Sequence, residues 1–188
     1  MAGSFTPFHS ERAVDILVKT NFDEDRVLRL LGWLAHENAL ILRGNASLPL
    51  LYDSNIVYAP ERGEVFSDVT HTLLAGQEDC DALAAYRAGE LVARGSAALF
   101  RGEPGFGVAR KRRLRTIHAE PMLTTRTSPG ERGLFHCIVR YRIGKRWYRD
   151  DPSERLGMNG RFDPAVLGRR AGIRQSLQSR SRHAPRTR

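Results

Sequence analysis

The sequence predicts a mixed α+β fold, in which a helix that begins at a cysteine packs on an antiparallel sheet. Three observations lead to this prediction. Apolar residues recur with helical spacing over residues 24–43. A second apolar segment, rich in alanine, begins at Cys80 and ends before Gly95. Residues 134–158 show the pattern of a β-hairpin, with Gly144 and Lys145 at its turn.

Length and charge predict one domain followed by a basic tail. A chain of 188 residues is typical of a single domain and can bury a substantial core. The net charge is +9, but residues 164–188 hold seven arginines and no lysine, aspartate or glutamate. We therefore place the domain at residues 1–163, where the charge is nearly balanced, and the tail at residues 164–188.

Several classes of protein are disfavoured by the composition. No apolar run approaches the roughly 18 residues of a membrane span, and the first twenty residues lack the pattern of a signal peptide. The two cysteines, Cys80 and Cys137, indicate a reducing compartment rather than a disulfide framework. No cysteine or histidine spacing is typical of a zinc site, so we expect neither metal nor cofactor.

The first half of the chain is expected to be mainly helical. Residues 12–20 contain a β-branched apolar run and predict a strand. The helix at 24–43 follows Asn21 and Asp23, which are candidate N-caps, and ends at Gly44. We expect a loop with a short extended piece at 45–64, and a helical turn at 67–76.

The second half is expected to supply the sheet. The helix from Cys80 ends at Gly95, and residues 96–101 predict the first strand. Residues 102–133 are rich in Gly, Pro and Arg, and should form a loop-rich insertion with one strand near 113–120. The hairpin at 134–158 then follows.

Cys80 is the first candidate for chemistry. A thiol nucleophile requires a thiolate, a nearby base and a group that orients the base. A helix N-terminus lowers a thiol pKa, whereas the carboxylates of Glu78, Asp79 and Asp81 would raise it if they approached the sulfur. Taken alone, Cys80 is more simply interpreted as a small buried residue than as a nucleophile.

The hairpin supplies a base and a group to orient it. With a two-residue turn, His136 and Asp151 lie on the same face as diagonal neighbours, roughly 7–8 Å apart at Cα. Asp150 then lies on the opposite face, and so does Cys137, which we interpret as a core residue. A turn one residue longer would exchange Asp150 and Asp151.

Three segments resemble transglutaminase-like proteins encoded by bacteriophages and prophages. The stretch "GQEDCDALAAYRAGELVARG" is similar to their segment around the cysteine. The stretch "LFHCIVRYRIGKRWYRDDPSERLGM" is similar to their histidine strand and closing Asp-Pro-Ser motif, and "LPLLYDSNIVYAPER" is similar to a stretch upstream of the cysteine. The resemblance covers about residues 12–160. Tyr86 and Gln77 depart from it, since Trp and Gly are usual there.

The resemblance implies a papain-like fold and a catalytic triad. The nucleophile would be Cys80, the base His136 and the orienting residue Asp151. Residues 102–133 would be an insertion between the cysteine and the histidine. Gln77 is a candidate for stabilising an oxyanion, as is the backbone N–H of Cys80.

Three functions are compatible with these features. The first is a thiol enzyme whose thioester passes to water, as in a protease or amidase, or to an amine, as in a transglutaminase. The second, implied by the resemblance, is a structural virion protein that assembles with other virion proteins in the bacterial host cytoplasm. The third, which rests on charge alone, is a nucleic-acid-binding protein.

Basic residues form the candidate surfaces for a partner. They could contact DNA or acidic protein surfaces, or serve only to solubilise the chain. The tail has no aromatic residue on which a base could stack. The residues concerned are Arg110, Lys111, Arg112, Arg113, Arg169, Arg170, Arg174, Arg180 and Arg182.

Overall fold

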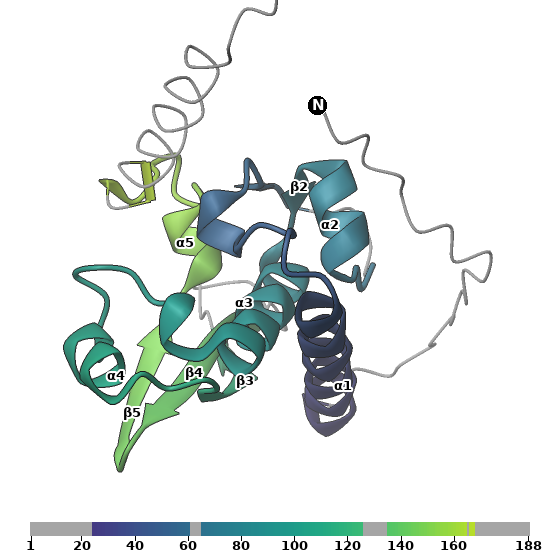
Figure 1. The fold of residues 1–188 in the computed structure, drawn as a ribbon. Helices are drawn as coiled ribbons and strands as arrows, with labels where there is room; N and C mark the ends of the chain where they lie inside the picture. The colour runs from purple at the N-terminus through teal and green to yellow at the C-terminus, as the bar shows by residue number, and fades with distance from the viewer. Residues whose placement is uncertain (1–23, 61–64, 126–134, 165, 168–188) are drawn as a thin grey trace, which may run out of the picture.

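A computed structural model describes residues 24–60, 65–125, 135–164, 166 and 167 (Figure 1). The strand expected at 12–20 lies outside these residues. So do the candidate caps Asn21 and Asp23, and the five tail arginines named above. The architecture below concerns the described part of the chain.

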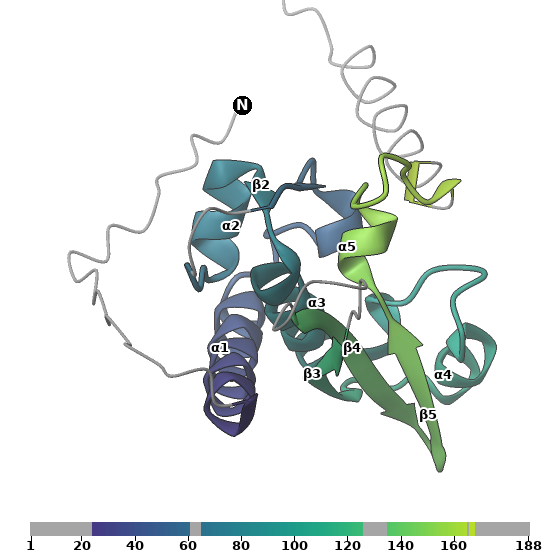
Figure 2. The ribbon, with the colours of Figure 1, turned by 180° about the vertical axis from the view of Figure 1, so that it is seen from behind.

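A central helix, α3 (Cys80–Arg94), lies between a second helix and a sheet. Helix α1 (Glu24–Gly44) packs along one side of α3, as both ribbon views show (Figures 1 and 2). The sheet on its other side is antiparallel, with β4 (Phe135–Ile143) between β3 (His118–Thr125) and β5 (Arg146–Asp150). The predicted α+β class, with a helix from Cys80 against the strand that carries His136, is confirmed.

The register of the hairpin is also confirmed. Ile143 pairs with Arg146 across the turn, and Val139 pairs with Asp150. Gly144 has φ +65°, a conformation that glycine adopts without steric cost at the first central position of a type II′ turn. The two-residue turn therefore directs Asp150 toward the interior, and β5 ends one residue before Asp151.

Shorter elements complete the fold around α3. The loop expected at 45–64 contains a short strand that pairs in parallel with the residues just before Cys80. The turn expected at 67–76 is a helix capped by the Asp68 side chain, which accepts a hydrogen bond from the His71 N–H. These elements are β1 (Val57–Tyr58), α2 (Val69–Ala75), β2 (Gln77–Glu78), α4 (Phe106–Arg112), α5 (Pro152–Arg155) and 3-10 turns at Leu51–Asp53 and Gly95–Ala97.

The strand expected at 96–101 is not formed. Gly95 has φ +55° and packs so closely on the 114–115 backbone that a Cβ there would lie 2.2 Å from the Leu114 carbonyl oxygen. The chain turns through a 3-10 turn at once, and the Glu103 carboxylate accepts a hydrogen bond from the Phe100 N–H. Phe100 is buried without joining a sheet.

The segment 102–133 is more regular than its composition suggested. It contains the helix α4, which was expected to be loop, and the strand β3, which begins at His118 instead of 113. Gly105 has φ +80° and starts α4 against the end of β4, where its Cα lies too close to Ile143 for a Cβ to fit. Glycine here permits close packing of a helix, which composition alone does not distinguish from a loop.

Two apolar clusters form the core, and α3 contributes to both. One fills the space between α1, α3 and the sheet; the other lies between α3, the 51–56 segment, α2 and α5. Val166 is fully buried in the second cluster, so packing extends past residue 163, where the tail was taken to begin.

The close contact of α1 and α3 depends on Gly89. A Cβ at this position would lie 2.7 Å from Asn38 Cβ and 2.9 Å from the Ala35 carbonyl oxygen. We expect Gly89→Ala to lower the free energy of unfolding by about 1–3 kcal/mol, because the two helices must separate. Gly32→Ala is the control: this position is exposed on α1 with nothing within 4 Å, and alanine should stabilise it by about 1 kcal/mol. Urea unfolding of both variants measures these free energies. Equal losses of stability in Gly89→Ala and Gly32→Ala would contradict the prediction.

Candidate functional site

A histidine and an aspartate meet where the hairpin ends. Nε2 of His136, on β4, donates a hydrogen bond of 2.6 Å to Oδ2 of Asp151. Asp151 immediately follows β5, and its other oxygen accepts from the Glu154 N–H and so caps α5. The carboxylate is therefore held by the cap as well as by the ring.

The second nitrogen of the imidazole has no hydrogen-bond partner among the residues that the structure describes. His136 is only 4% exposed, and within the described chain its Nδ1 is buried without a donor or acceptor. Buried polar atoms are nearly always satisfied, so an exception calls for an explanation. Because Nε2 carries the proton shared with Asp151, Nδ1 of the neutral ring is an acceptor.

The thiol of Cys80 lies beside the residue that follows His136. Cys80 is the first residue of α3, and Asp79 caps the helix by accepting from the Asp81 N–H. The backbone N–H of Cys137 lies near enough to the Cys80 thiol to lower its pKa. Cys137 itself is buried in the core, as predicted. The three predicted site residues are thus brought to one region, where α3 begins beside β4.

The surroundings of Cys80 favour the protonated thiol. Burial raises its pKa most, and the charges of Asp79 and Asp81 raise it further. The Cys137 N–H and the Cys80 N–H lower it, but the resulting pKa is about 12. A solvent-exposed thiol at a helix N-terminus has a lower pKa than a thiol in solution. At Cys80, desolvation raises the pKa by more than the helix N-terminus lowers it. To become a thiolate near neutral pH, Cys80 must pass its proton to another group.

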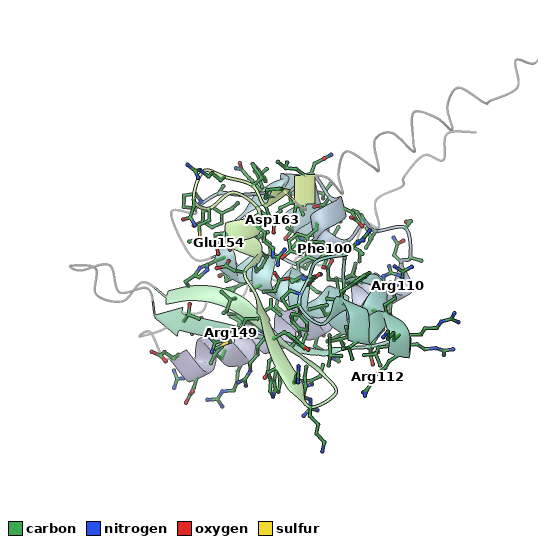
Figure 3. All side chains as sticks on the ribbon, turned by 90° about the vertical axis from the view of Figure 1, so that its left-hand side faces the viewer. Phe100, Arg110, Arg112, Arg149, Glu154 and Asp163 are labelled. Atoms are coloured by element: carbon green, nitrogen blue, oxygen red, sulfur yellow. The ribbon has the colours of Figure 1, made fainter. Side chains whose placement is uncertain are left out.

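A cleft of about 590 Å³ adjoins the imidazole on its Asp151 side. Arg149 on β5, Glu154 on α5 and Asp163 are among the side chains around it, and all three are labelled in Figure 3. Arg161 also lines the cleft, and Asp163 is paired with Arg155 at 2.8 Å.

A buried ionic cluster lies behind the site and was not predicted. The guanidinium of Arg87, on α3, is fully buried and pairs with Glu90, Glu103 and Asp150. Asp150 also binds Arg155 at 2.7 Å and accepts from the Tyr52 hydroxyl. The neighbouring residues Asp150 and Asp151 therefore serve the interior and the site respectively. One feature of the sequence could have indicated this cluster: Arg87 and Glu90 are charged residues at i, i+3 spacing on the apolar side of a helix.

The other predicted residues are spread over the surface. Gln77 lies on β2 and is exposed. Arg110, Lys111 and Arg112 form the last turn of α4, Arg113 follows it, and all four are exposed. In the parts of the chain that the structure describes, no group of three His, Cys, Asp or Glu side chains is arranged to hold a metal ion. None of the described helices is long and apolar enough to cross a membrane.

Comparison of the chain with protein-family models, with curated proteins and with solved structures found no match.

Proposed function

We propose that this protein is a thiol enzyme that acts on amides through Cys80, His136 and Asp151. The observation that carries the proposal is the buried imidazole, held by Asp151 on one nitrogen and without a partner among the described residues on the other. The next residue along the strand, Cys137, has the backbone N–H that lowers the pKa of the Cys80 thiol. A cysteine on a helix start, a histidine on a strand and an aspartate after the next strand also support a papain-like arrangement.

The chemistry follows from the two nitrogens of the ring. Nδ1 of His136 takes the proton of the Cys80 thiol, which gives a thiolate and an imidazolium held by Asp151. The thiolate attacks the amide carbonyl, the C–N bond breaks and the imidazolium gives its proton to the leaving amine. Water or a second amine then attacks the thioester, loses its proton to the imidazole and releases the thiol. The backbone N–H of Cys80 is the candidate donor to the developing oxyanion.

A second candidate function is favoured by the pKa of Cys80. A thiol whose pKa is held near 12 is chemically inert at neutral pH. In this reading the protein is a structural component of a phage particle, assembled in the host cytoplasm, that retains the fold as a scaffold. Its arginine-rich segment 164–188 would then bind other virion proteins or DNA.

The reactivity of Cys80 toward iodoacetamide as a function of pH tests the first function against the second. The enzyme should alkylate with an apparent pKa well below the roughly 8.5 of a free thiol. His136→Ala should raise that apparent pKa above the free-thiol value, because the base is lost while burial and the carboxylates of Asp79 and Asp81 still favour the protonated thiol.

Two controls make the measurement specific. Cys80→Ser should abolish labelling, because the remaining thiol, Cys137, is only 1% exposed. Circular dichroism of His136→Ala should match the parent, so that altered reactivity is not due to unfolding. A Cys80 that alkylates only at strongly alkaline pH in the parent would overturn the enzyme and support the scaffold.

A further inference from the structure

A second surface, far from Cys80 along the hairpin, combines cations with aromatic rings. Residues 106–118 and 135–149 contain five lysines and arginines each, and no aspartate or glutamate. All ten side chains are exposed. They are Arg110, Lys111, Arg112, Arg113, Arg115, Arg140, Arg142, Lys145, Arg146 and Arg149. Of these, Arg140, Arg142 and Arg149 share one face of the sheet with Trp147, and we call this surface the hairpin face.

Helix α4 packs on the inner side of the hairpin, against Ile143 and Tyr148, so its cations flank the hairpin face at the turn and do not lie on it. A Cβ built on Gly144 would lie 3.2 Å from Nη1 of Arg112, so the α4 cations lie beside the β4–β5 turn. Figure 3 shows Arg110 and Arg112 projecting from α4. Glu120 on β3 binds Arg140 at 2.6 Å.

Planar side chains form a row across the outer face of the sheet. His118 pairs with Arg142 in the register of β3 and β4, and Arg142 pairs with Trp147 in that of β4 and β5. The rings of His118 and Trp147 lie edge to face, 5.5 Å between centroids. The guanidinium groups of Arg140 and Arg142 lie 5.1 and 5.5 Å from the Trp147 ring. Trp147 is nevertheless 47% exposed.

From this arrangement we infer that the hairpin face binds single-stranded nucleic acid. Unpaired bases stack on exposed aromatic rings and on arginine planes, while lysine and arginine neutralise the phosphates. Bases within a duplex are stacked on one another, so they do not offer their faces to Trp147. An acidic protein would match the charge but would provide no planar partner for the exposed ring. The inference does not depend on the proposed enzymatic function.

Fluorescence of Trp147 reports directly on this contact. The chain has two tryptophans, so the full-length Trp33→Phe variant leaves Trp147 as its single reporter. We expect an oligothymidylate of about ten nucleotides to quench it saturably, with an affinity that falls as salt rises. Trp147→Ala should weaken binding roughly tenfold in an anisotropy assay with labelled oligonucleotide, and Trp147→Phe should retain most of it.

Matched charge variants separate the hairpin face from the net charge and from the arginines of the tail. The triple variant Arg140→Ala, Arg142→Ala, Arg149→Ala should weaken binding and reduce the salt dependence. The triple variant Arg26→Ala, Arg29→Ala, Arg43→Ala removes the same charge from exposed positions of α1, across the molecule (Figure 1), and should change neither.

Three results would overturn the inference. Equal losses of oligonucleotide affinity in the two triple variants would show that binding depends on net charge alone. Polyglutamate that binds as tightly and quenches Trp147 as strongly as the oligonucleotide would assign the hairpin face to acidic proteins. Absence of saturable quenching at low salt would leave the face without this function.

Discussion

Arg87→Met should lower the free energy of unfolding by about 3–5 kcal/mol at pH 7, the largest loss we expect from a single substitution. Arg87 is fully buried and binds three carboxylates, of Glu90, Glu103 and Asp150. It also donates to the Ala98 carbonyl and lies 4.7 Å above the Tyr52 ring. Methionine fills similar volume but leaves the carboxylates in a low-dielectric region with one fewer compensating charge.

The loss should shrink as the pH falls. Burial raises the pKa of Glu90 to about 7 and also raises that of Glu103, and Arg87 lowers both. Without Arg87 these carboxylates take up protons more readily. A carboxylate whose pKa is raised by folding stabilises the folded state least at high pH, since the unfolded chain has already lost the proton. The unfolding free energy of Arg87→Met should therefore lie closer to that of the parent at pH 5 than at pH 7.

Urea unfolding at pH 7 and pH 5 measures both effects. Arg29→Met, an exposed position on α1, is the control and should change stability by less than about 0.5 kcal/mol. A variant as stable as the parent at pH 7 would show that the cluster contributes no net stability, and an equal loss at both pH values would refute the protonation argument.

Local patterns in the sequence account for the parts of the fold that depend on nearest neighbours. The apolar spacing over 24–43 and the run from Cys80 to Gly95 predicted α1 and α3 because each helix buries one continuous side. The two-residue turn at Gly144 determines which side chains share a face. That parity predicted the contact of His136 with Asp151.

Features that depend on distant partners could not be predicted in this way. Arg87 and Glu90 become interior residues because Glu103 and Asp150 arrive from other segments, and no local pattern marks that encounter. The segment 96–101 has the composition of a strand, but the contact of Gly95 with the 114–115 backbone turns the chain. The pKa of Cys80 is likewise set by burial, which outweighs the effect of the helix terminus.

Adjacent aspartates on opposite faces of the hairpin allow one matched pair of variants to separate stability from reactivity. Asp150→Ser should cost about 3–5 kcal/mol of unfolding free energy, because it leaves Arg87 and Arg155 without their shared carboxylate. Asp151→Ser should cost less than about 1 kcal/mol, because serine caps α5 as well as aspartate does.

Reactivity should follow the opposite order. A carboxylate bound to an imidazole favours its charged form by about tenfold or more, so Asp151→Ser should slow alkylation of Cys80 at pH 7 by at least that factor. Asp150→Ser, studied below its unfolding temperature, should leave the rate within about twofold, because Asp150 has no contact with the ring. Alkylation rates of Cys80 and urea unfolding of the Asp150→Ser and Asp151→Ser variants test both orders. If Asp151→Ser reacts like the parent, the carboxylate serves only as a helix cap and the buried imidazole does not act on Cys80.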